Sequence, residues 1–120
     1  MAGRELGSWG EERAAQYLRR RGYKILARNY SCRGGEIDVI ASRGKYVAFV
    51  EVKLRKSAAF GGAGEFVDRR KQNKLRLTAE LYLSCHQTRL QPRFDVIEVY
   101  APQGTDTKAP RVRHIENAFF

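Results

Sequence analysis

The chain opens with a helical pattern of apolar residues and continues as a series of strands. Across residues 7–21 apolar side chains recur every three or four positions, and Gly22 follows as a helix stop. Residues 23–30 alternate between apolar and polar positions and end in a turn-prone segment that contains two glycines. Two further strands are expected at residues 36–42 and 46–54, joined by a short hairpin turn.

The second half of the chain predicts a long helix followed by more strand. Residues 55–66 have no periodicity and contain three glycines, so we expect a loop there. Asp68 is suited to cap an amphipathic helix that extends to about His86. A strand is expected at residues 93–101, and residues 111–120 are typical of an edge strand and a tail.

These elements predict an α/β sandwich, in which a mixed sheet of about four to five strands is flanked by helices. The order of the elements is α-β-β-β-α-β. Because a helix separates the strand at 93–101 from the strand at 46–54, these two strands should run parallel. A chain of 120 residues is the size of one domain, so we expect a single core over residues 1–120.

The charge balance indicates a polyanionic partner. Lysine and arginine outnumber aspartate and glutamate by 23 to 13, which gives a net charge of +10. Nucleic acid is the first candidate for such a surface. A membrane is not expected, because no apolar run approaches the ~20 residues of a spanning helix. The first ten residues also lack a signal pattern, and we therefore expect a cytoplasmic protein.

Charged residues interrupt both strands of the predicted hairpin. Glu36 and Asp38 should share one side of the first strand, and Ile37 and Val39 the other side. Glu51 and Lys53 should share one side of the second strand. Neighbouring strands lie about 4.8 Å apart, so Asp38 and Glu51 would be like charges side by side. Such a pair is destabilising unless a divalent cation or the ammonium of Lys53 lies beside it.

This trio of Asp38, Glu51 and Lys53 is suited to metal-dependent hydrolysis of phosphodiester bonds. Carboxylate ligands favour Mg²⁺ or Mn²⁺, whereas zinc would recruit His or Cys. Magnesium held by two carboxylates keeps waters that a substrate phosphate and an attacking water can replace. Lys53 can position or deprotonate that water, or balance negative charge in the transition state.

The same spacing also fits a purely structural role. Antiparallel sheets often keep one solvated face, and Glu-Val-Lys is ordinary strand alternation with a surface ion pair. Spacing alone therefore leaves both interpretations open.

Five segments resemble the sequence blocks of a known bacterial family. They are GSWGEERAAQYL (7–18), GGEIDVIA (34–41), FVEVKLR (49–55), RRKQNKL (69–75) and RFDVIEV (93–99). The chain resembles the YraN-like family, which is similar to the PD-(D/E)XK nucleases that include restriction endonucleases and archaeal Holliday junction resolvases. The resemblance spans about residues 5–117. It implies a restriction endonuclease-like fold and a nuclease activity.

The resemblance also implies roles for particular residues. The two acids of the superfamily motif fall on Asp38 and Glu51, and its lysine falls on Lys53. Glu11 matches a glutamate of the first helix that joins the metal site in related resolvases. Gln72 resembles a polar residue that many members present from the second helix.

Other charged residues are expected to support the site. Glu36 is a candidate for a supporting role next to the metal ligands. The candidates for nucleic-acid binding are Arg55, Lys71, Gln72 and Lys74, most of them near the start of the second helix, where the amides and the dipole attract phosphate. No base-reading motif is present, so we expect recognition of duplex or branched DNA by shape. Cutting two strands would call for a homodimer.

Three hypotheses follow from the sequence. The leading one is a Mg²⁺- or Mn²⁺-dependent DNA endonuclease that selects branched DNA, flaps or ends. The second is a non-catalytic or partner-dependent nucleic-acid-binding module with the same fold, acting in DNA repair or recombination. The third is an adaptor that recruits proteins through its second helix.

Overall fold

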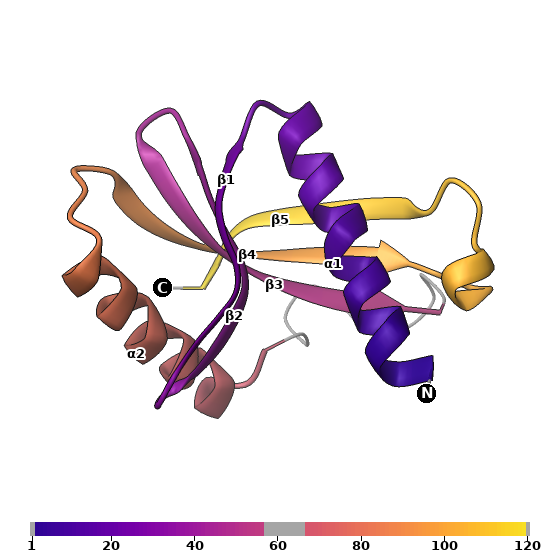
Figure 1. Cartoon of the computed structure of the whole chain (residues 1–120), viewed down its shortest axis with the longest axis horizontal. Helices are drawn as coiled ribbons and strands as arrows, with labels where there is room; N and C mark the ends of the chain where they lie inside the picture. Colours follow the sequence, from indigo (N-terminus) through magenta and orange to yellow (C-terminus); the bar gives the residue numbers. More distant parts are fainter. Residues whose placement is uncertain (1, 57–66, 120) are drawn as a thin grey trace.

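A five-stranded mixed sheet with one helix against each face forms the fold (Figure 1). The computed structural model describes residues 2–56 and 67–119, so most of the loop expected at 55–66 lies outside the described residues. The elements are, in chain order, α1 (Ala2–Arg20), β1 (Lys24–Cys32), β2 (Gly35–Arg43), β3 (Tyr46–Arg55), α2 (Arg69–Cys85), β4 (Gln91–Tyr100), the 3-10 turn η2 (Gly104–Asp106) and β5 (Arg111–Phe119). The predicted α/β class is confirmed.

The end of α1 and the start of α2 lie where the sequence predicts them. The amides of Gly22 and Tyr23 bond back to the carbonyls of Arg19 and Leu18, which is a Schellman cap, and Gly22 adopts the left-handed φ of 88° that this cap requires. Asp68 caps α2 by accepting a 2.8 Å hydrogen bond from the Lys71 amide. No helix in the described ranges is both long and apolar enough to cross a membrane.

Helix α1 starts earlier than the expected residue 7. It begins at Ala2, so Gly7 lies inside the helix and does not mark its start. Ala, Arg, Glu and Leu of the preceding segment, AGREL, are good helix formers, and they offset part of the cost of the three glycines in α1, Gly3, Gly7 and Gly10.

The strands follow each other in sequence order across the sheet, β1-β2-β3-β4-β5. Neighbours pair antiparallel except β3 and β4, which run parallel over their whole length from Tyr46↔Gln91 to Arg55↔Tyr100. The parallel crossover predicted from the intervening helix is therefore confirmed. The tail at residues 111–119 is the edge strand β5.

Each face of the sheet has its own apolar core. Side chains of α2 and alternate strand positions form the first core, which contains Ile40, Val47, Phe49, Leu75, Ala79, Tyr82 and Val96. Side chains of α1 and the opposite strand positions form the second core, which contains Ala14, Leu18, Val39, Ala41, Ala48, Val50, Ile97 and Val99. The period-two alternation of the strands thus divides them between the two helices.

Strand β2 leaves β3 halfway along its length. Their ladder extends from Arg43↔Tyr46 to Val39↔Val50 and goes no further within the described residues, although β2 begins at Gly35 and β3 ends at Arg55. We call this opening the fork. The start of β2 follows its other neighbour, β1, with which it pairs as far as Cys32↔Gly35.

Contact with α2 holds the diverging hairpin of β1 and β2 in place. A Cβ on Gly34 in its turn would lie 2.8 Å from a methyl of Leu77. The expectation that Ile37 shares a side with Val39 is wrong, because Ile37 packs in the α2 core and Val39 in the α1 core. The loss of regular alternation coincides with the point where β2 is no longer constrained by β3.

A buried ionic network supports the α1 face of the sheet. Asp95 of β4, which is 0% exposed, accepts hydrogen bonds from Arg93, from His114 of β5 and from the Asn117 amide, at 2.8 to 3.0 Å. Arg93 also donates to the Tyr23 hydroxyl at 2.6 Å, beside the end of α1. The network therefore ties β4, β5 and the segment after α1 together.

Replacing Asp95 with Asn should destabilise the fold by about 3 kcal/mol at pH 7, because the largely buried charge of Arg93 would keep only the exposed Glu116, 3.9 Å away, as an ion-pair partner. Burial alone would raise the pKa of Asp95, but its hydrogen bonds from His114, Arg93 and the Asn117 amide hold the pKa below 3.8. This stabilisation is complete above pH 3.8 and is lost as the pH falls further. Urea unfolding from pH 7 to pH 3 should show the difference between the two proteins narrowing. Asp106→Asn, at an exposed position, is the control and should leave stability unchanged.

Candidate active site

Asp38 of β2 points into the fork and bonds to the backbone of β3. Its Oδ2 accepts a 2.8 Å hydrogen bond from the amide of Val52, which lies beyond the last paired residue of the ladder. The carboxylate therefore replaces the strand partner that this amide loses when β2 diverges. The Val52 amide is the only hydrogen-bond donor to Asp38 among the residues that the structure describes.

The electrostatic surroundings of Asp38 are strongly negative. Burial raises the pKa of its carboxyl group to about 7, and the charge of Glu51 adds to this effect. The Val52 hydrogen bond lowers the pKa, but the charges of Glu11 and Glu36 raise it further. Acids from α1, β2 and β3 thus act on one position in a chain that is otherwise basic.

Glu51 of β3 lies between two lysines. It is 6% exposed, and its Oε2 is 3.6 Å from Nζ of Lys53 and 3.5 Å from Nζ of Lys71. Lys53 comes from the same face of β3, as the spacing predicts, whereas Lys71 comes from the first turn of α2. The structure therefore brings Asp38, Glu51 and Lys53 together, and adds Lys71 to them.

Glu11, predicted as a metal ligand, and Glu36, predicted as a supporting acid, lie at the edge of this site. Glu11 is partly buried on α1, and its charge acts on Asp38. Glu36 is exposed at the start of β2 and accepts a 3.3 Å hydrogen bond from the hydroxyl of Ser31. Both are close enough to influence Asp38 electrostatically.

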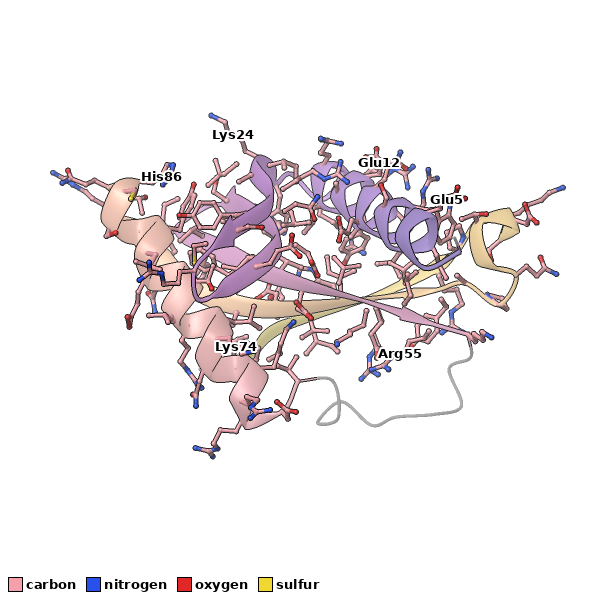
Figure 2. The ribbon with its side chains drawn as sticks, turned by 60° about the horizontal axis from the view of Figure 1, so that its bottom comes forward. Glu5, Glu12, Lys24, Arg55, Lys74 and His86 are labelled. Atoms are coloured by element: carbon pink, nitrogen blue, oxygen red, sulfur yellow. The ribbon has the colours of Figure 1, made fainter. Side chains whose placement is uncertain are left out.

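Two of the other residues predicted to bind nucleic acid, Gln72 and Lys74, lie on α2, and the third, Arg55, lies on β3. The side-chain amide of Gln72 donates a 2.9 Å hydrogen bond to the carbonyl of Val67 and accepts one from Arg76. These hydrogen bonds stabilise the start of α2. Lys74 is exposed on α2, and Arg55 lies at the end of β3 that is away from α2 (Figure 2).

Sequence reasoning missed Glu98 of β4. It is 2% exposed, pairs with Lys53 in the parallel register, and its Oε2 accepts a 3.2 Å bond from Nε of Arg55. The signal in the sequence was a lone acid in the apolar strand segment DVIEVY, which resembles the position of Glu51 in FVEVKL.

The donor set of the site fits a hard divalent cation. Across residues 2–56 and 67–119 no three His, Cys, Asp or Glu side chains form a complete ligand group. Magnesium is commonly bound by only one or two carboxylates, with water and substrate phosphate as its other ligands. Asp38 and Glu51 supply two such carboxylates, and the unfavourable negative charge around Asp38 is the condition that a bound cation would relieve.

Comparisons with known proteins place the chain among bacterial relatives over nearly its whole length. The family model described as "Uncharacterised protein family UPF0102" matches residues 10–99. A UPF0102 protein of Caldanaerobacter subterraneus is 49% identical over 115 residues, which cover 95% of this chain and 93% of the relative. A UPF0102 protein of Syntrophomonas wolfei is 46% identical over 118 residues, which cover 97% and 98%.

Replacing Asp38 with Asn should stabilise the metal-free protein at pH 8 by about 2 kcal/mol, because it removes a charge that burial and Glu51 disfavour. Asn retains an oxygen for the Val52 amide. The unfolded chain loses this proton near pH 3.8 and the folded chain near 7, so the gain should grow with pH between these values and stay constant above them. Urea unfolding in a chelator tests this. An equal gain from Glu36→Gln, at the exposed edge of the site, would contradict it.

Proposed function

We propose that this chain, which belongs to the uncharacterised protein family UPF0102, hydrolyses phosphodiester bonds of DNA with Mg²⁺ or Mn²⁺. The observation that carries the proposal is the fork, where Asp38 and Glu51 come together beside Lys53. The resemblance to the PD-(D/E)XK nucleases supports it, because the acids and the lysine of that motif match these three residues.

In this proposal the carboxylates of Asp38 and Glu51 hold the cation. When bound, the cation would polarise the scissile phosphate and favour ionisation of an attacking water. The hydrogen bond from the Val52 amide fixes Asp38, so its orientation does not depend on side-chain packing alone. Glu11 and Glu36 would strengthen the attraction of the site for a cation through their charge.

Lys53 acts at the scissile phosphate. Its ammonium is 3.6 Å from Glu51 and partly exposed, so it can hold a phosphate oxygen or the attacking water beside the carboxylates. A fixed positive charge at this place stabilises negative charge as it develops on the phosphate. Lys71, at 3.5 Å from the same Glu51 oxygen, can contact the same phosphate from α2.

The surface charge supports DNA as the substrate class. The net charge is +10, and the first turns of α2 present Arg69, Arg70, Lys71 and Lys74. Phosphate contacts of this kind position a duplex without reading its sequence. We therefore propose selection by shape, with branched DNA, flaps or ends as substrates.

A second candidate is a binding module that does not cleave DNA by itself. The observation in its favour is that Lys53 and Lys71 already balance the charge of Glu51. Such a module would bind DNA with the same salt dependence and show no metal-dependent cleavage.

The purified protein should cleave at least one labelled substrate among branched, flapped, single-stranded and duplex DNA, in Mg²⁺ or Mn²⁺ and not in chelator. Asp38→Asn and Lys53→Gln should each lower the rate by at least about a hundredfold, since each removes a group that acts on the scissile phosphate. Lys45→Gln removes the same charge from the distant turn between β2 and β3 and is the matched control.

Cleavage that survives in Asp38→Asn and Lys53→Gln would mean that the fork is not the catalytic centre. DNA binding without cleavage of any substrate by the wild type would favour the binding module.

A further inference from the structure

A second group of charges lies beside the fork on the same face of the sheet. In the registers of β3, β4 and β5, Lys53 is paired with Glu98, and Glu98 is paired with Arg113. Paired residues of neighbouring strands project to the same side, so these three side chains form one row across the sheet. The next row is formed in the same way by Arg55, Tyr100 and Arg111.

Glu98 is the buried centre of this group. It is 2% exposed, accepts 3.2 Å and 2.8 Å hydrogen bonds from Nε of Arg55 and the Tyr100 hydroxyl, and lies 3.6 Å from a guanidinium nitrogen of Arg113. The two arginines come from different strands, β3 and β5, and the side chain of Arg113 is 49% exposed. One buried carboxylate thus holds two cationic side chains that reach the surface.

The stability of the fold does not require a buried glutamate at this position. Burying a carboxylate is costly even with good partners, and an apolar residue in such a strand would often serve stability as well. What Glu98 does provide is orientation, because a guanidinium that bonds to a fixed carboxylate has a fixed plane and fixed donors. The group still has a net positive charge, since two arginines share one glutamate.

We propose that Glu98 holds Arg55 and Arg113 as a phosphate-binding subsite for the DNA backbone, separate from the scissile phosphate at the fork. This proposal rests on the proposed function for the identity of the ligand. Arg55 lies four residues beyond Glu51 along β3, which corresponds to about 13 Å. The subsite therefore takes a phosphate a few nucleotides away from the one at Asp38 and Glu51. It sets the direction in which the strand leaves the active site.

Two different roles of Glu98 predict opposite effects of its removal on DNA binding. If Glu98 affected bound DNA only through its own negative charge, its removal would strengthen binding, because that charge repels phosphate. If it orients two phosphate-binding arginines, its removal weakens binding. The sign of the change therefore separates the two roles.

The experiment compares the affinity of four variants and the wild type for a fluorescent duplex and a fluorescent branched DNA. Binding is measured over a range of salt concentrations in Ca²⁺, without turnover. Glu98→Gln and Arg113→Gln should each weaken binding about tenfold, and Arg113→Gln should lower the salt slope by about one. The matched controls are Glu80→Gln and Arg89→Gln, which remove the same charges from exposed positions on α2 and in the loop after it. They should change binding less than about twofold.

Each outcome has a distinct meaning. Tighter or unchanged binding by Glu98→Gln, or equal losses in Arg113→Gln and Arg89→Gln, would overturn the subsite while leaving the nuclease proposal intact. Should Glu98→Gln fail to fold by circular dichroism, the comparison of Arg113→Gln with Arg89→Gln decides. A wild type that binds DNA with the expected variant losses and never cleaves it would keep the subsite and refute the nuclease. A wild type that binds no DNA would overturn both.

Discussion

The divergence of β2 from β3 after the Val39↔Val50 pair is the constraint on which the candidate site depends. A sheet that stayed paired would satisfy the Val52 amide with backbone and would keep Asp38 on one face, away from the gap between strands. The turn of the β1–β2 hairpin packs on α2, and where β2 has left β3 the carboxylate of Asp38 accepts the hydrogen bond of that amide. The same opening lets Glu11 of α1 and Glu51 of β3 influence one carboxylate from different elements.

The electrostatics of the fork oppose the stability of the fold when no cation is bound. Burial and neighbouring acids disfavour the charged form of Asp38. Elsewhere the fold pairs its buried acids closely: Asp95 is bonded to Arg93 and His114, and Glu98 to Arg55 and Tyr100. Asp38 is the exception among these described acids, because its one hydrogen bond comes from a neutral amide. Unrelieved charge of this kind is typical of functional sites, where ligand binding compensates for the cost.

The sequence predicted the architecture and the central trio because both follow from local patterns. Strand alternation and the two helix caps mark the elements, and the short hairpin turn and the intervening helix determine the strand directions. Glu-Val-Lys puts Glu51 and Lys53 on one side of β3. The position of Ile37 and the reach of Asp38 into the fork were not predictable, since they depend on where β2 separates from β3. The pairing of Lys71 with Glu51 and the burial of Glu98 likewise depend on contacts between elements distant in sequence. The nuclease assignment itself stays a prediction.

A calorimetric titration of the metal-free protein with Mn²⁺, for the wild type and for Asp38→Asn, tests most directly whether the fork is a metal site. We expect saturable binding by the wild type, and binding that is lost or weakened at least about tenfold in Asp38→Asn, because the variant lacks one of two carboxylate ligands. Thermal unfolding of both proteins without metal would show that the variant is folded. The absence of Mn²⁺ binding in the wild type, or equal binding by both proteins, would contradict the claim that the fork is a metal site.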